Sequence, residues 1–309
     1  MKIKYLSRIP KQEEDKVLVL GFFDGVHLGH QKVIKKGRQI AKEKGLPLAI
    51  LTFNHHPSIV FKKQERYRYL STLKEKEQLF ANLGVDILYI VPFTSSFAKQ
   101  TPQTFVNDYI INLGAKEVVV GFDYTYGASK TATAHQLPLY ANQLFKVHIV
   151  GALKDDGKKV SSTAIRHFLE QGATEKANHQ LGRIYTTHGL VVHGDARGRT
   201  LGYPTANIEP WVDELLPGLG IYAVEMKVKN KWYKGMASIG HNITFGHFDL
   251  SVEINLFDFD EEIYGEEVSI RWYHRLRSEQ KFMQITELID QLNKDECNVR
   301  RYFKEKKDD

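Results

Sequence analysis

Residues 21–30 read Gly-Phe-Phe-Asp-Gly-Val-His-Leu-Gly-His, and they stand between a compact apolar run and a helical pattern. The apolar run, Val17–Gly21, predicts a β-strand, and the spacing of apolar residues in Leu28–Lys44 is typical of a helix. A glycine-containing link of this kind offers free backbone N–H groups and the positive end of a helix to an anion. We therefore expect a phosphate-binding loop at this junction.

The alternation of strand and helix continues to about residue 171. Further strands are expected at 46–53, 86–91, 116–121 and 145–150, and helices at 72–83, 102–113, 135–144 and 162–171. Such alternation indicates a parallel sheet with helices on both faces. Ligands of these sheets bind at the carboxyl ends of the strands, which is where the 21–30 segment is expected to lie.

After Gly172 the pattern changes to successive β runs. They cover residues 184–193, 221–228, 232–239, 251–257 and 267–273, and a helical tail follows at 281–304. Successive strands with short turns predict an antiparallel barrel or sandwich. We therefore expect two domains, 1–175 and 183–309.

Composition sets broad limits on the class of protein. The chain has 309 residues, enough for about two domains, and no apolar run approaches the roughly 20 residues that a membrane span needs. Its single cysteine, Cys297, excludes an internal disulfide and a cysteine zinc site, and together with the polar N-terminus it favours the cytoplasm. A net charge of +6 suits anionic small molecules. We expect a monomer or weak oligomer that binds neither membrane nor nucleic acid.

Two histidines give the 21–30 segment its chemistry. His27 and His30 are one helical turn apart, so both rings can face one pocket at the N-terminus of the helix. Two imidazoles there can donate hydrogen bonds to a triphosphate and stabilise the charge that develops as pyrophosphate leaves. The alternative, that they only satisfy local backbone groups, is disfavoured by their position between strand and helix. No GxxxxGK[ST] motif is present, so the chain is not a Walker ATPase.

A second phosphate motif is Val160-Ser-Ser-Thr-Ala-Ile-Arg166 at the start of a helix. Serine and threonine at this place are common helix caps, and the same geometry presents hydroxyls, N–H groups and the helix dipole to a phosphate. Arg166 adds a cation on the next turn. Capping and phosphate binding are compatible.

These motifs carry a family resemblance. HxGH followed by SSTxIR resembles the nucleotidyltransferase superfamily, and GxFDGVHxGH with SSTAIR resembles the FMN adenylyltransferase module of prokaryotic FAD synthetases. Two more loops fit that family: residues 52–57, Thr-Phe-Asn-His-His-Pro, and the glycine-bounded segment 120–127. The resemblance implies a Rossmann-like parallel sheet, ATP and FMN as substrates and FAD as product. The FMN phosphate would attack the α-phosphorus of ATP, with no covalent enzyme intermediate.

The resemblance also assigns residues in the first half. The catalytic residues would be His27, His30 and Arg166, and the ATP or phosphate group would be bound by Gly21, Phe23, Asp24, Gly25, Gly29, Ser161, Ser162 and Thr163. The flavin would be bound by Asn54, His55, Pro57, Asp123 and Tyr126. Asp24 has two open roles, since it could organise the loop or act near Mg²⁺.

The second half carries its own constellation in residues 198–207, Gly-Arg-Thr-Leu-Gly-Tyr-Pro-Thr-Ala-Asn. Thr205 and Asn207 provide hard oxygen ligands suited to Mg²⁺. The segment resembles the riboflavin kinase signature, which implies a β-barrel of riboflavin kinase type with a terminal helix, and riboflavin and ATP as substrates. The residues so implied are Gly198, Arg199 and Gly202 for phosphate, Glu253 as the catalytic base, and Arg277 and Glu279 beside the flavin.

The sequence leaves other functions open. Residues 240–245, Gly-His-Asn-Ile-Thr-Phe, lack the arginine and proline of the family segment, so one alternative is a monofunctional FMN adenylyltransferase with a degenerate kinase domain. Another is transfer of a nucleotide to a different acceptor phosphate. A nucleic-acid-binding protein built on these modules is a third, although no aromatic–basic stacking signature supports it.

Overall fold

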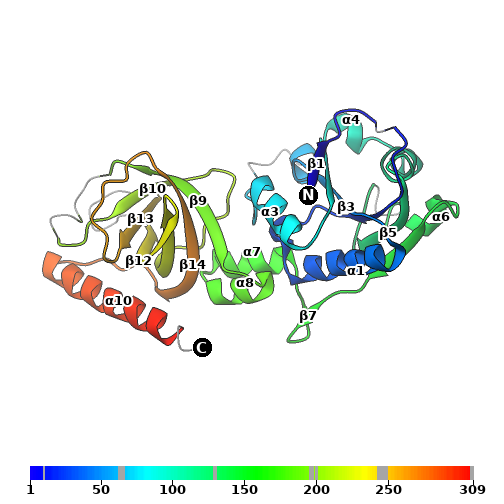
Figure 1. The fold of residues 1–309 in the computed structure, drawn as a ribbon. Coiled ribbons are helices and arrows are strands. Elements are labelled where there is room, and N and C mark those ends of the chain that lie inside the picture. Colours follow the sequence, from blue (N-terminus) through cyan, green and yellow to red (C-terminus); the bar gives the residue numbers. More distant parts are fainter. Residues whose placement is uncertain are drawn as a thin grey trace. The chain divides into compact units, whose positions relative to one another are not determined.

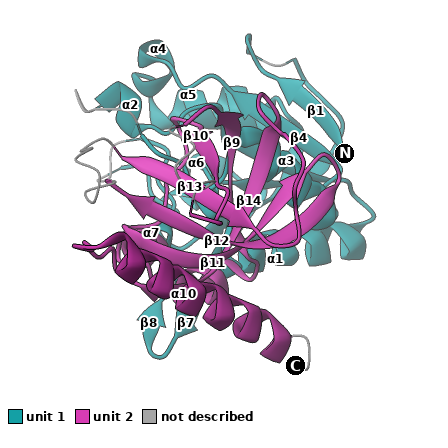
Figure 2. Cartoon of the chain, turned by 90° about the vertical axis from the view of Figure 1, so that its left-hand side faces the viewer, with its two compact units in different colours: residues 1–162 teal, residues 163–309 magenta. Residues whose placement is uncertain are grey.

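The computed structural model describes residues 1–9, 11–61, 67–127, 131–194, 198, 201–241 and 250–306. The chain divides into two compact units, residues 1–162 and residues 163–309 (Figures 1 and 2). The domain limits expected from the sequence, 1–175 and 183–309, stay a prediction.

The first unit is built on a six-stranded parallel sheet with the strand order β1-β4-β3-β2-β5-β6 (Figure 1). Its strands are β1 (Lys2–Tyr5), β2 (Lys16–Leu20), β3 (Leu48–Phe53), β4 (Ile87–Val91), β5 (Ala115–Gly121) and β6 (Lys146–Val150). Strands β2 and β3 are buried along their whole length, as is usual for central strands of a parallel sheet covered on both faces. The predicted sheet is confirmed, and β1 is an edge strand that the sequence analysis missed.

Helices cover both faces of this sheet. Successive side chains of each strand point to opposite faces, so β2, β3, β4 and β5 each contribute to two core clusters. Val17 and Val19 of β2 belong to a core cluster with helices α1 (Leu28–Lys44) and α3 (Leu73–Asn82). Alternate residues of β2 belong to a second cluster, which includes residues of α5 (Pro102–Val106), η2 (Asn107–Ile111) and α6 (Leu137–Ala141). The remaining elements are η1 (Asp24–Val26), α2 (Ser58–Phe61), α4 (Ser95–Ala98), β7 (Lys154–Asp155) and β8 (Lys158–Lys159).

Two predicted helices differ from the structure. The helix expected over 135–144 is only α6, because Asn142 and Gln143 take left-handed φ values of 43° and 61° and end it. The helix expected over 102–113 changes from α5 into the π-helical turn η2 and ends before Gly114, which has φ 73°.

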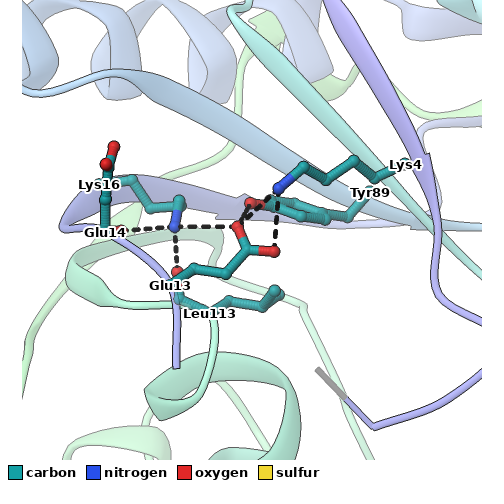
Figure 3. Close-up of polar contacts among 6 residues, drawn as sticks. All are labelled: Lys4, Glu13, Glu14, Lys16, Tyr89 and Leu113. Carbon is teal, nitrogen blue, oxygen red and sulfur yellow. Dashed lines mark hydrogen bonds and ion pairs between the residues drawn. The ribbon is translucent and has the colours of Figure 1, made fainter. Parts of the chain in front are cut away.

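A partly buried polar cluster lies at the start of β2 (Figure 3). The Glu13 carboxylate accepts hydrogen bonds from Lys4 Nζ at 3.0 Å and from the Tyr89 hydroxyl. Lys16 Nζ lies 3.5 Å from Glu13 Oε2 and also donates to the Leu113 carbonyl. Since Lys16 is buried, Glu13 supplies the counter-charge that its ammonium group needs.

The second unit is a closed antiparallel barrel with the strand order β10-β13-β12-β11-β14-β9. Its strands are β9 (Tyr185–Val192), β10 (Ala206–Pro210), β11 (Gly220–Val228), β12 (Lys231–Gly240), β13 (Ser251–Leu256) and β14 (Glu267–Arg277). The predicted barrel is confirmed, and β10 is an additional strand. Helix α7 (Ser162–Glu170) begins at the last residue of the first unit, and α8 (Thr174–Leu181) follows it.

Helices pack on the outside of the barrel. The terminal helix α10 (Ile285–Glu305) buries Val299 and Phe303 in a cluster with Ala223 and Met236 of the barrel strands. Helix α8 is fixed by Asn178, whose Nδ2 donates to the Trp272 carbonyl at 2.8 Å. The predicted terminal helix is confirmed, with its first residue at Ile285 rather than 281.

Candidate active sites

The loop after β2 has an unusual backbone. Phe23, Gly25 and Val26 have φ values of 57°, 79° and 41°, in the left-handed region. Glycine adopts this conformation without penalty, whereas phenylalanine and valine do so only where their surroundings hold them there. Such conformations concentrate at functional sites. The contacts that hold Phe23 and Val26 in this conformation are therefore part of the candidate site.

The carbonyl of Phe22 is fixed from two directions. It accepts a hydrogen bond from Thr52 Oγ1 at 3.0 Å and one from Lys76 Nζ at 3.2 Å. Lys76 Nζ also lies 4.2 Å from the centroid of the Phe22 ring, a cation–π contact. The peptide before the left-handed Phe23 is thus tied to β3 and to α3.

The Asp24 side chain ties the same loop to residues 67–71. Its carboxylate is buried and accepts hydrogen bonds from the Leu70 backbone N–H at 2.9 Å and from the Tyr67 hydroxyl at 3.1 Å. The neighbouring Gly25 N–H donates to Ser71 Oγ at 3.0 Å. Of the two roles left open for Asp24, these contacts favour the organisation of the loop.

His27 and His30 form a stacked pair at the start of α1. Their ring centroids lie 3.6 Å apart, and His27 Nδ1 accepts the backbone N–H of His30 at 3.2 Å. Because Nδ1 is an acceptor, a neutral His27 carries its proton on Nε2, where it can donate to a ligand. Gly29 makes room for this ring, since a Cβ there would lie 3.0 Å from His27 Cε1.

The electrostatics of His30 favour the neutral imidazole. Burial lowers its pKa well below the ordinary 6.5, and the nearby His27, Lys76 and Lys159 lower it further. Within the described part of the chain, its buried Nδ1 has no hydrogen-bond partner. A buried polar atom of this kind fits a group whose partner is a ligand.

The Ser-Ser-Thr motif meets this loop through one residue. Ser162 Oγ donates to the Asp24 carbonyl at 2.9 Å, so the first turn of α7 contacts residues 21–30, the histidine loop, within the first unit. Ser161 directly precedes that turn. Thr163 and Arg166 belong to the second unit, and their roles stay predictions.

Two of the loops predicted to bind flavin follow β3 and β5. Asn54 Oδ1 accepts the Phe93 N–H at 2.9 Å, which ties the ends of β3 and β4 together. Near it, His55 is exposed and Pro57 is partly exposed. After β5, the exposed Asp123 forms a 2.5 Å ion pair with Lys159.

Aromatic side chains line the same loops. Tyr126 stacks on Phe105 with a centroid separation of 5.5 Å, and its hydroxyl is buried without a partner among the described residues. His56 stacks on Tyr67 at 4.0 Å and meets the edge of Phe22 at 4.9 Å. These rings give the site flat apolar surfaces next to polar groups.

The sequence analysis missed four side chains of this region, namely His56, Tyr67, Lys76 and Lys159. Lys76 had a signal, because Leu73, Lys76 and Phe80 share one helix face and the lysine therefore falls on an apolar stripe. Tyr67 had none, since it lies in an irregular segment whose partner, Asp24, is 43 residues away.

The second constellation lies on adjacent barrel strands. Glu253 of β13 pairs with Asn207 of β10, and Thr205 Oγ1 donates to Glu253 Oε2 at 3.3 Å. The barrel thus brings together a carboxylate, a hydroxyl and an amide from segments 48 residues apart. Asn255, not anticipated from the sequence, donates from Nδ2 to the Pro204 carbonyl at 2.7 Å and holds the turn before Thr205.

Glycines of the 194–202 segment make close approaches possible. A Cβ at Gly194 would lie 2.1 Å from Asn207 Nδ2, and one at Gly198 would lie 2.2 Å from the Tyr203 carbonyl oxygen. Gly202 has φ 81°. Arg199, predicted to bind phosphate, lies outside the described residues, as do residues 242–245 of the 240–245 segment, which lacks the arginine and proline of the family pattern.

The two predicted flavin residues of the barrel have protein partners. The Arg277 guanidinium holds both oxygens of the buried Asp295 on α10, with the shortest contact at 2.7 Å. Glu279 Oε1 accepts the His241 N–H at 3.0 Å. Both side chains are thus fixed by the barrel and its terminal helix.

Two family models match the chain. The FAD synthetase model matches residues 9–164, and the riboflavin kinase model matches residues 181–303. A bifunctional riboflavin kinase/FMN adenylyltransferase of Listeria monocytogenes is 49% identical over 291 residues, which cover 94% of this chain and 93% of that protein. The chain belongs to this family. Because both models match, two activities are favoured over the monofunctional alternative.

Other family members agree over nearly their whole length. The Bacillus subtilis protein of the same name is 43% identical, covering 97% of each chain, and the Escherichia coli K12 protein is 32% identical, covering 97% of this chain and 96% of its own. A crystal structure named a macrolide-efflux protein from Streptococcus pneumoniae matches with a TM-score of 0.90 and 37% identity, covering 97% of this chain and 99% of that one. Its name differs from those of the curated relatives, and the structural similarity supports the fold described above. None of the helices in the described part of this chain has the length and apolarity to cross a membrane.

Proposed function

We propose that the two constellations carry the two reactions of a bifunctional enzyme of FAD biosynthesis. The barrel unit phosphorylates riboflavin with ATP to give FMN. The first unit transfers AMP from ATP to FMN, giving FAD and pyrophosphate. The observation that carries the proposal for the first unit is the stacked His27–His30 pair beside a strained loop at the head of α1.

In the first unit, the FMN phosphate attacks the α-phosphorus of ATP in line, and pyrophosphate leaves. His27 donates from Nε2 to the phosphate oxygens on which charge develops. His30 is neutral before the nucleotide binds, and the negative charge of ATP favours its protonation, so that it becomes a stronger donor when the substrate is in place.

The other residues proposed for this reaction bind and orient its substrates, and Thr163 and Arg166 among them belong to the second unit. The phosphates and the adenylate are held by Gly21, Phe23, Gly25, Gly29, Ser161, Ser162, Thr163 and Arg166, and Asp24 organises the loop. The flavin lies against Asn54, His55, Pro57, Asp123 and Tyr126. Free backbone N–H groups at a helix start suit the phosphates, and aromatic rings suit the isoalloxazine.

In the barrel, Glu253 accepts the proton of the ribityl hydroxyl as the γ-phosphoryl group is transferred. Thr205 and Asn207 would hold Mg²⁺, and the hydroxyl, amide and carboxylate that meet there are the oxygen donors this cation prefers. When bound, Mg²⁺ neutralises charge on the transferred phosphoryl group. Gly198, Arg199 and Gly202 approach the nucleotide phosphates, while Arg277 and Glu279 border the flavin.

We also propose the partners, the compartment and the oligomeric state of the enzyme. Its partners are flavins and nucleotides, with no nucleic acid or membrane among them. It acts in the cytoplasm as a monomer or weak oligomer, with domains 1–175 and 183–309. Its single cysteine, exposed on α10, is compatible with a reducing compartment.

The test is to incubate the purified protein with ATP and Mg²⁺, once with riboflavin and once with FMN, and to separate the flavins by chromatography. FMN and FAD formed from riboflavin would support both activities. FAD from FMN alone, with riboflavin unchanged, would reduce the proposal to the first unit. No product in either reaction would reject the flavin as acceptor.

A further inference from the structure

Lys76 is a charged residue in a mostly apolar environment. Its side chain lies on the face of α3 that buries Phe80, and only 2% of the residue is exposed. Burial lowers its pKa from 10.5 to about 8, although Asp24 opposes the shift, so the ammonium form still prevails at neutral pH. Burying an ammonium group costs stability unless its partners compensate for the lost water.

The partners of Lys76 lie in the histidine loop. Its Nζ donates to the Phe22 carbonyl at 3.2 Å and lies over the Phe22 ring. The charged or titratable groups with which it interacts across the packing are Asp24 of η1 and His30 of α1. All of these partners stand at the adenylylation site, so the buried charge is directed at that site.

The geometry explains what the contact does. The Phe22 carbonyl directly precedes Phe23, the first left-handed residue of the loop, and its direction sets where the following N–H groups and His27 lie. Thr52 Oγ1 is the second donor to this carbonyl, at 3.0 Å. Two donors from β3 and α3 hold the peptide plane more firmly than one.

We propose that Lys76 is a positioning residue for FMN adenylylation, which fixes the Phe22 carbonyl and thereby the left-handed loop that carries the two histidines. The inference rests on the proposed function of that loop. Lys76 acts through the loop and needs no contact with substrate. A misplacement of about 1 Å in a catalytic group lowers the rate by about 100-fold, so a residue of this kind affects turnover strongly.

The variant Lys76→Met separates this role from a structural one, because methionine keeps much of the side-chain volume and removes the buried charge. We expect kcat for FAD formation from FMN to fall about 10- to 100-fold. The thermal unfolding midpoint should stay unchanged or rise, since the cost of burying the ammonium group is gone. Riboflavin phosphorylation by the same chain should not change.

Two further variants complete the test. Lys74→Met, at an exposed position of the same helix, should change neither activity. Thr52→Val removes the other donor, and its effect on FAD formation should be non-additive with that of Lys76→Met because both act on one carbonyl.

The outcomes are distinct. FAD formation by Lys76→Met within about twofold of the wild type would overturn the inference while leaving the proposed function intact. A fall in activity that only follows a lower unfolding midpoint, or failure of Lys76→Met to fold, would assign Lys76 a structural role and also overturn it. Absence of FAD formation by the wild type would reject the proposed function itself.

Discussion

His27 caps the helix that carries His30, because its Nδ1 accepts the His30 backbone N–H at 3.2 Å while the two rings stack 3.6 Å apart. This single contact places the proton of a neutral His27 on Nε2, the atom that we propose donates to the nucleotide. His27 therefore has a structural role at Nδ1, and the proposed chemical role belongs to Nε2.

Replacement of His27 can separate these tasks. Asparagine is a good N-cap acceptor, so His27→Asn should keep the stability of α1, whereas His27→Ala should lose about 1 kcal/mol. Both should lower kcat for FAD formation by about 100-fold or more, because neither retains the imidazole donor. The measurements are turnover with FMN and unfolding followed by circular dichroism. Full FAD formation by His27→Asn would contradict the role of Nε2.

His30→Ala should strongly reduce FAD formation, by about 100-fold or more, and leave riboflavin phosphorylation mostly intact. The reason is that His30 lies in the first unit and Glu253 in the barrel, and neither side chain is proposed for the other reaction. Both rates are measured on the same protein sample. An equal loss of both activities would argue against two separate sites.

Glu253→Gln should have the opposite effect. The amide keeps the size of the side chain and an acceptor for Thr205 Oγ1, which now contacts the carboxylate at 3.3 Å, but it cannot take a proton. Riboflavin phosphorylation should fall by about 100- to 10,000-fold, with FAD formation from FMN retained. Glu209→Gln, on the exposed side of β10, is the matched control and should leave both rates unchanged.

The sequence was sufficient for the parallel sheet, the barrel and the histidine loop because each has a local signature. Helix α1 was predicted at Leu28–Lys44, its observed bounds, since its apolar spacing and the glycine after it leave little choice. Strand β1 was missed because Lys2–Tyr5 is a polar edge strand with no apolar run. Its assignment depends on pairing with β4, more than 80 residues away.

The same limit applies to the sites. The HxGH motif predicts two ligand-binding histidines from four consecutive residues. Lys76 and Tyr67 join them only through the fold, which brings β3, α3 and residues 67–71 around one loop. Arg277 shows the converse. The family resemblance predicts that it borders a flavin, and the structure adds a buried acidic partner on α10 that no local pattern indicates.

Asp295→Asn tests that partner. Asp295 is 1% exposed and accepts three hydrogen bonds from Arg277, so its neutralisation leaves a guanidinium without its counter-charge and should cost about 3 kcal/mol or more. Glu296→Gln, which alters the surface pair with Arg300, should change stability by less than about 1 kcal/mol.

The readout for these two variants can be specific to the barrel unit. The three tryptophans of the chain, at positions 211, 232 and 272, all lie in the second unit, so their fluorescence follows its unfolding by denaturant. Equal stability of Asp295→Asn and Glu296→Gln would show that the buried pair does not anchor α10.

The Glu13 cluster should govern the acid stability of the first unit (Figure 3). Burial alone would raise the pKa of Glu13, but hydrogen bonds from Tyr89 and Lys4, with the charges of Lys4 and Lys16, outweigh it and lower the pKa below 4.5. The folded state therefore holds this carboxylate ionised more firmly than the unfolded state does. Its contribution to stability is present above pH 4.5 and is lost as the pH falls through the lowered value.

Glu13→Gln should thus destabilise the first unit at neutral pH by about 2 kcal/mol or more, because Lys16 stays buried without its counter-charge. The difference from the wild type should shrink as the pH falls below 4.5. Glu14→Gln, at the exposed neighbouring position, should stay within about 0.5 kcal/mol of the wild type. Denaturant unfolding followed by circular dichroism measures all three proteins. A Glu13→Gln difference that is independent of pH would mean that packing, rather than the charge of Glu13, stabilises this end of the sheet.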